Sequence, residues 1–200
     1  MASKIDIWNL ALSHVGASAT IADPNEQGVA ANHCRRFYPV ALSCTLERHS
    51  WSFATRRVHL VPTTNPVGHW MFAYVLPIRC VRARAVLPPG AADDTQEQPY
   101  AIESLDSGTG VIYSNTEQAV LKYTALVEDV SKFTPFFTLA LSYDLAAMLV
   151  GPISKDERMK ARLLQSVQYY IAQAQAQDAN SSMSTAYRDF IPSHLAARNG

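Results

Sequence analysis

The 200-residue sequence has few cysteines, few glycines and no excess of charge of either sign. Its three cysteines are too sparse for the disulfide framework of a small secreted domain, and they indicate a reducing compartment. Seventeen basic and 17 acidic residues give a formal net charge of zero. The chain therefore lacks the global positive field by which sequence-independent nucleic-acid binders displace counterions. Any contact with DNA is expected to be local or steric.

Long uninterrupted apolar runs are also absent. Lys4 and Asp6 fall where a signal peptide needs an apolar run, and the most apolar stretch, residues 133–150, carries Asp144 in its middle. We therefore expect a soluble protein without membrane contact, made in the cytoplasm. A hydrophobic content of 48% is enough for one well-cored domain with a small second lobe.

Capping signals in the first quarter of the chain predict two helices. Ser3 opens the first helix and Gly16 ends it. The dipeptide Asp23-Pro24, with a glutamate two residues later, opens a second helix that runs to about residue 50. Pro39 lies inside this second helix, where it predicts a kink or a short break.

Similar signals return near the C-terminus. Thr134-Pro135 opens a third helix, which is expected to end at the Gly-Pro pair 151–152. Ser154 and Glu157 read as a capping box that opens a fourth helix, whose apolar stripe continues to about Gln177.

Residues 51–129 have a different character, because prolines separate short runs rich in aromatic and β-branched residues. The expected strands are 58–61, 70–76, 80–87, 100–105, 111–113 and 119–127, and the turn-rich residues 106–110 favour a hairpin. The fold class is therefore α+β, mostly α with a β-rich insertion, in the order α-α-β-α-α. Residues 1–50 and 130–177 are expected to form a small four-helix bundle, and 51–129 the β-rich insertion.

Residues 178–200 read as an extended C-terminal arm. The segment is first small and polar, and a few apolar residues follow that the arm cannot bury by itself. Such a segment is typical of one that becomes ordered on a partner. A frayed terminus, or a strap across its own domain, is the alternative. The candidate anchors are Tyr187, Arg188, Phe190, Ile191 and Leu195.

The sequence contains none of the common catalytic or phosphate-binding motifs. Cys34 and Cys44 are ten residues apart, which is ~15 Å along a helix and too far for shared tetrahedral metal coordination. We expect both to be core hydrophobes, with no catalytic residue, metal or cofactor in the chain. The alternatives are a small thiol-dependent helical enzyme that uses Cys34 or Cys44 with a histidine, and a peptide-binding helical module.

Arginines and acidic residues of the insertion are the best candidates for an interface. Arg82 and Arg84 share one face of a predicted strand by its two-residue period, where they can meet phosphates or the acidic loop of a neighbouring subunit. Asp93 and Asp94 supply such a loop. A solvated strand face is the alternative.

Several short sequence motifs, taken in order, carry a resemblance. They are Ile7-Trp8-Asn9-Leu10-Ala11-Leu12 before Val15-Gly16, Leu46 with Trp51, Phe53-Ala54 and Arg57, Trp70 with Ala73-Tyr74, Leu76-Pro77, Cys80 and Arg82, Val120 with Tyr123, and Phe133, Pro135 and Phe137 before Leu145-Ala146-Ala147. Over residues 5–180 the chain resembles the tail tubular protein A-like head-to-tail adaptors, or connectors, of short-tailed bacteriophages.

The resemblance implies a non-enzymatic structural virion protein of the neck and tail. Twelve copies would form a ring that docks below the portal protein and presents a lower surface to the tail nozzle or tail tube protein. Double-stranded DNA would pass through the channel during ejection without specific binding, and the C-terminal arm would grip the portal. The chain departs from the family pattern at Arg79, where we expect a small acidic residue.

Overall fold

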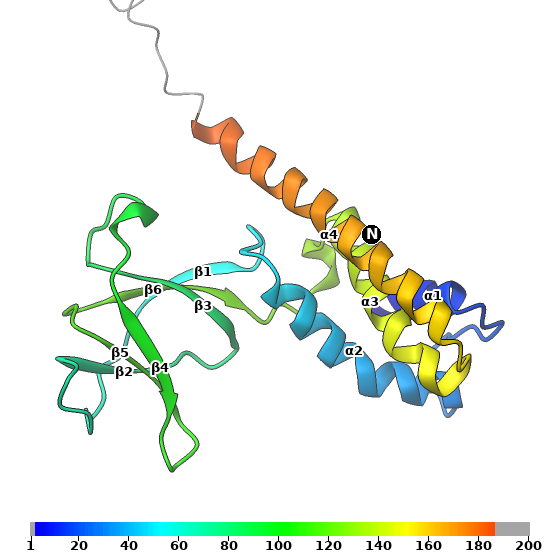
Figure 1. Ribbon diagram of the computed structural model, residues 1–200, viewed down its shortest axis with the longest axis horizontal. Helices are drawn as coiled ribbons and strands as arrows, with labels where there is room; N and C mark the ends of the chain where they lie inside the picture. Colours follow the sequence, from blue (N-terminus) through cyan, green and yellow to red (C-terminus); the bar gives the residue numbers. More distant parts are fainter. Residues whose placement is uncertain (1–2, 187–200) are drawn as a thin grey trace, which may run out of the picture. The chain divides into compact units, whose positions relative to one another are not determined.

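The computed structural model describes residues 3–186, with side chains through residue 181 (Figure 1). The described chain forms two compact units, a helical unit of residues 3–45 and 129–186 and a β unit of residues 46–128. Two helices precede the β segment and two follow it. This order confirms the α+β class.

The first helix, α1 (Lys4–His14), begins as predicted: the Ser3 side chain accepts a hydrogen bond from the Asp6 amide, and Asp6 accepts one from the Ser3 amide. Gly16 follows the helix with a φ of +71°, which suits a left-handed stop. The second helix, α2 (Val29–Glu47), starts later than predicted. The Asp23 signal builds a turn instead, because Gly28 lowers the helix propensity of the residues before Val29. The helix then continues through Pro39.

The third helix, α3 (Pro135–Ile153), has the predicted Thr134 cap, which accepts a hydrogen bond from the Phe137 amide. It includes Gly151 and Pro152 in its last turn, so the predicted stop at that pair was one turn early. The predicted capping box at Ser154 was also wrong, since Asp156 accepts the amide hydrogen bonds of Arg158 and Met159.

The fourth helix, α4 (Glu157–Ala186), continues past Gln177, where we expected the arm to begin. Residues 178–186 contain neither glycine nor proline, so nothing in them terminates a helix. Asp178 is itself only 9% exposed. The arm prediction is therefore corrected for residues 178–186.

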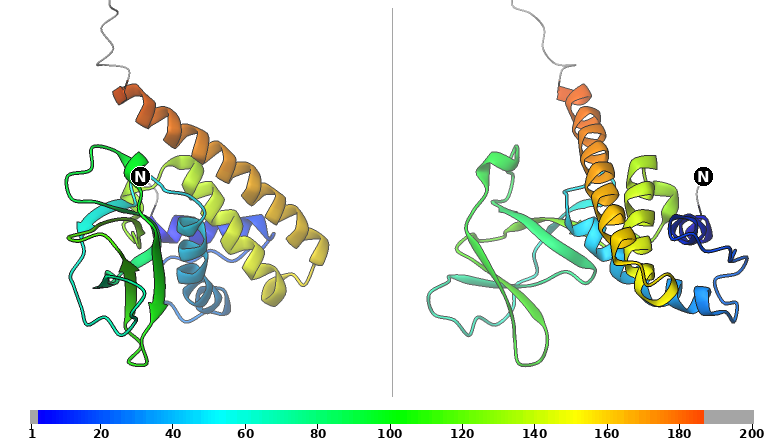
Figure 2. Two further views of the ribbon diagram at one scale, coloured as in Figure 1. Left: turned by 60° about the vertical axis from the view of Figure 1, so that its left-hand side comes forward. Right: turned by 45° about the vertical axis from the view of Figure 1, so that its right-hand side comes forward.

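The central element of the helical unit is α3, which packs against α1 and α4 (Figures 1 and 2). Its length and apolar composition match those of a membrane span, but 61% of that stretch is buried within the protein. Asp144, 3% exposed, accepts a hydrogen bond from Thr45 of α2 at 3.1 Å. Stacked aromatic rings link α3 to α1 and α4. The ring of Tyr143 in α3 stacks on His14 of α1 at 3.8 Å between centroids and on Tyr170 of α4 at 5.1 Å.

The β unit contains two three-stranded antiparallel sheets. The first has the order β1-β6-β3, and the second β2-β5-β4. Their bounds are β1 (Thr55–His59), β2 (Phe72–Val75), β3 (Cys80–Leu87), β4 (Tyr100–Ser104), β5 (Gly110–Ser114) and β6 (Val120–Ala125). The predicted hairpin forms from β4 and β5.

Side chains from both sheets share one core. Leu60, Val86 and Leu121 of the first sheet and its flanks pack with Tyr74 and Ile112 of the second. A smaller cluster of Ala73, Val111 and Tyr113 lies apart from it, with Trp70 packed against it. The sheets are therefore two layers of a single β unit.

Candidate assembly surface

A carboxylate from the loop between β3 and β4 lies beside two cations of the first sheet. Arg57 of β1 and Lys122 of β6 are direct cross-strand partners, an arrangement in which like charges repel each other. Asp94 offsets that repulsion, because its two oxygens accept hydrogen bonds from Arg57 at 2.9 Å and from Lys122 at 2.5 Å. The Lys122 hydrogen bond, followed by that of Arg57, holds the pKa of Asp94 below its ordinary value.

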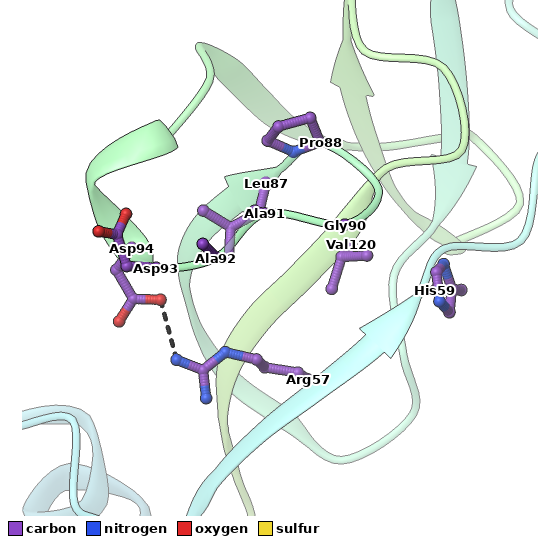
Figure 3. A pocket seen from close by; sticks show the side chains of 10 residues that line it. All are labelled: Arg57, His59, Leu87, Pro88, Gly90, Ala91, Ala92, Asp93, Asp94 and Val120. Carbon is purple, nitrogen blue, oxygen red and sulfur yellow. Dashed lines mark hydrogen bonds and ion pairs between the residues drawn. The ribbon is translucent and has the colours of Figure 1, made fainter. Parts of the chain in front are cut away.

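The same cluster borders a hollow of about 450 Å³, where Arg57 and Asp94 face each other (Figure 3). Its walls combine these charges with His59 and with apolar side chains such as Leu87 and Pro88. The lining contains no serine, threonine, cysteine or lysine. The hollow therefore combines two carboxylates, an arginine and a histidine with an apolar wall.

Asp93, which we predicted to be an interface residue, has a local role. Its carboxylate caps the short 3-10 helix η1 (Asp94–Gln96) by accepting hydrogen bonds from the Thr95 amide at 3.0 Å and the Thr95 hydroxyl at 2.6 Å. The two neighbouring aspartates thus fix the shape of the loop and hold it on the sheet.

Arg84, another predicted interface residue, binds backbone within the β unit. Its Nη2 donates to the carbonyls of Glu47 at 2.8 Å and His49 at 2.7 Å, and its Nε donates to the Thr124 hydroxyl at 2.9 Å. These carbonyls belong to the end of α2 and the residues after it, where helical acceptors lack intrahelical partners. Burial lowers the pKa of Arg84, and the neighbouring positive charge of Arg82 adds to the effect.

Arg82 is much less engaged than Arg84. Its side chain is 54% exposed, and among the described residues its one ion pair is with Glu47 at 3.8 Å. The four predicted interface residues therefore form two groups. Arg82 and Arg84 lie on β3 beside the end of α2, and Asp93 and Asp94 lie in the loop after β3. The five anchors from Tyr187 to Leu195 lie outside the described residues.

The cysteines carry free thiols. Burial raises the pKa of Cys34 and that of Cys80 to about 11. A nucleophilic thiol needs the opposite change, which a nearby cation or a helix N-terminus provides. Among the described residues, no group of three or more His, Cys, Asp and Glu side chains is placed to hold a metal ion.

The prediction missed a set of exposed large apolar side chains in the β unit. They are Val58, Val61, Met71, Val75, Ile78 and Ile102, with exposed fractions from 36% to 93%. Val58, Val75 and Ile102 lie in strands, where the sequence does not reveal which face of a two-sheet unit is covered, and Val61, Met71 and Ile78 lie in the connections between strands.

Ile78 is the most exposed of this set, at 93%. It lies in a turn closed by the hydrogen bond from the Cys80 amide to the Pro77 carbonyl, and Arg79 occupies the next position with a φ of +72°. A type II turn prefers glycine there, so the turn carries strain. Arg79 also forms an ion pair with Glu128 at 2.5 Å.

Comparison of the chain with models of protein families finds no match, and comparison with curated proteins finds none either.

Proposed function

We propose that this chain is a structural virion subunit, a head-to-tail adaptor of a tailed bacteriophage that assembles into a ring between the portal and the tail. The observation that carries the proposal is the set of exposed apolar side chains of the β unit, led by Ile78 at 93%. Apolar groups of this size favour a protein contact over water. A neighbouring copy or the tail protein is the partner that would cover them.

The four helices supply the wall of the ring as one small bundle. Support comes from the contacts of α3 with the other helices, namely His14 with Ser142 at 3.1 Å, Thr45 with Asp144 at 3.1 Å, and the stack of Tyr143 on Tyr170. The α4 helix has 30 residues against 19 in α3, so it is ~17 Å longer. The C-terminal arm follows this long helix and grips the portal protein.

The chain conducts DNA without turnover. Its formal net charge of zero suits a channel wall along which double-stranded DNA must slide, since phosphate contacts add affinity whatever the sequence. The raised pKa of the buried Cys34 thiol supports a structural role for that residue over a nucleophilic one. The lower surface of the ring would meet the tail nozzle or tail tube protein.

The proposal is tested by sedimentation of the full-length chain mixed with the portal ring of the same virus. A complex that contains many copies of the chain is expected. A second sample lacking residues 187–200 should keep the far-UV spectrum of the full chain and lose most of its portal binding. A full-length chain that sediments as a monomer beside free portal would contradict the proposed function.

A further inference from the structure

Two edge strands of the β unit, one on each sheet, carry opposite charge. Strand β1 ends the order β1-β6-β3, and β4 ends the order β2-β5-β4, so each has one side without a hydrogen-bonded neighbour strand among the described residues. β1 carries Arg56, Arg57 and His59, whereas β4 carries Glu103. An open edge is a template for pairing with another chain.

The register of each sheet identifies the backbone groups that point outward. Leu60 donates its amide hydrogen bond to Ala119 of the β6 side, so residues in step with Leu60 bond inward while Arg57 and His59 direct their N–H and C=O groups outward. In the other sheet Leu105 donates to Thr109. By the same alternation, Ile102 and Ser104 direct their backbone groups away from β5.

Two edges can pair only where outward groups face each other. In antiparallel orientation this condition is met when Arg57 lies opposite Ile102 and His59 opposite Tyr100. The Thr55 amide already donates to the Trp51 carbonyl at 2.8 Å and takes no part in the pairing. Arg56 then lies directly opposite Glu103 on one face of the joined sheet. Opposite charges at such a position stabilise the pair.

The Arg56 side chain is available for this contact. Among the described residues only its Nη1 atom makes hydrogen bonds, donating to the carbonyls of Phe53 at 3.0 Å and Thr55 at 2.8 Å. The other guanidinium donors can bind a carboxylate. Val58, 39% exposed, and Ile102, 45% exposed, add apolar area at the same edges.

Pairing of β1 with itself offers no charge complementarity. Antiparallel pairing of two β1 edges sets Arg57 opposite Thr55, a second Arg57 or His59, and because β1 contains no acidic residue, none of these registers gives Arg56 a carboxylate. Parallel pairing of β1 with β4 in step sets Arg56 opposite Ala101 and loses the match with Glu103. The complementary antiparallel partner of β1 is therefore β4 of another copy.

We infer that β1 of one copy pairs antiparallel with β4 of the next, with Arg57 opposite Ile102, so that successive β units join through their sheet edges. The contact uses two different edges of the same chain, and such a head-to-tail contact generates a closed ring or an open filament. The inference deepens the proposed function and rests on it for the closure of the ring. The joining of the edges is tested independently of that closure.

The first test is disulfide trapping in the full-length chain. Val58 and Ala101 lie opposite each other in this register at a position without direct hydrogen bonds, where Cα atoms are about 4.5 Å apart and a disulfide fits. The double variant Val58→Cys with Ala101→Cys should give a ladder of covalent multimers on a non-reducing gel after mild oxidation. The control Val58→Cys with Ile102→Cys places the thiols on opposite faces and should give no ladder beyond that of the single variants.

The second test reverses the charges. Arg56→Glu and Glu103→Arg should each weaken self-association roughly tenfold, and the double variant should restore it. The matched controls are Arg36→Glu and Glu157→Arg, which make the same charge changes at exposed positions on α2 and α4. Sedimentation velocity over a range of concentrations measures the effect.

The outcomes separate this inference from the ring. Rings in the electron microscope without a ladder in the paired variant would overturn the edge pairing and leave the proposed function standing. A ladder that grows into open filaments would keep the edge pairing and contradict the ring. A dimer trapped by Ile102→Cys alone would instead indicate that β4 pairs with β4, which overturns the inference, as does the absence of any specific cross-link.

Discussion

The helical unit and the β unit differ in how each disposes of its apolar and charged groups. In α3 the side chains from Phe137 to Val150 are largely buried, and the buried Asp144 is hydrogen-bonded to Thr45. In the β unit, Ile78 and Met71 are exposed while Arg84 is bound to backbone carbonyls. The helical unit buries its most apolar helix, although Val29 and Val40 of α2 are 74% and 51% exposed, whereas the most exposed large apolar side chain, Ile78, belongs to the β unit.

The sharpest version of this contrast concerns the core of the helical unit. Phe137 is 0% exposed, so Phe137→Ala should lower the free energy of unfolding by about 3–5 kcal/mol through lost burial and a cavity. Urea denaturation followed by circular dichroism measures the change. Leu164→Ala, at a residue 42% exposed on α4, is the matched control. Equal losses for the two variants would contradict the packing described for α3.

The next largest effect is expected from replacing Arg84, the β3 residue that is hydrogen-bonded to carbonyls at the end of α2. Arg84→Ala removes charged donors from the carbonyls of Glu47 and His49 and should destabilise the β unit by about 2–3 kcal/mol. Arg82→Ala should cost less than about 0.5 kcal/mol, since the ion pair of Arg82 with Glu47 spans 3.8 Å at the surface. Thermal unfolding compares the two. A larger loss of stability for Arg82→Ala than for Arg84→Ala would contradict the roles assigned to the two arginines.

Acid should reveal the Asp94 cluster. The pKa of Asp94 is lowered in the folded state, so its stabilising contribution is present above the unfolded pKa of about 3.9 and is lost as the pH falls through the folded value. The wild-type chain should therefore lose stability more steeply below about pH 4 than Asp94→Asn. Because the pair is exposed, the difference should stay within about 1 kcal/mol. Parallel melting curves from pH 2.5 to 7 would refute the cluster's contribution.

The smallest effect on folding is expected at Ile78, the most exposed of the large apolar side chains. Ile78→Ser should change the free energy of unfolding by less than about 0.5 kcal/mol, because the side chain is 93% exposed. The same substitution should reduce the amount of chain that sediments with the portal ring. Unchanged assembly would remove Ile78 from the surface that the partner covers.

Local signals predicted the start of some elements well and the partners of the strands poorly. Ser3 and Thr134 cap their helices as their side-chain chemistry requires, and the hairpin of β4 and β5 follows from its turn residues. The prediction did not place β6, which follows β5 directly, between β1 and β3 of the other sheet. Strand pairing depends on long-range burial, and short-range pattern does not encode it.

In the candidate assembly surface, too, local features were predicted and long-range partners were not. The sequence brought Asp93 and Asp94 to notice as an acidic loop, but it could not reveal that Lys122, from a distant strand, shares the Asp94 carboxylate with Arg57. Arg84 looked like a surface arginine because its acceptors are backbone carbonyls, which every residue possesses. Residues 46–49 and β3 meet only in the folded chain.

The central claim is that copies of this chain assemble with each other. Native mass spectrometry of the complex formed by the full-length chain on the portal ring counts those copies directly. The account predicts a discrete complex that contains twelve copies and is depleted by Arg56→Glu. A series of complexes whose copy number rises with the concentration of the chain, without a discrete final number, would contradict the account.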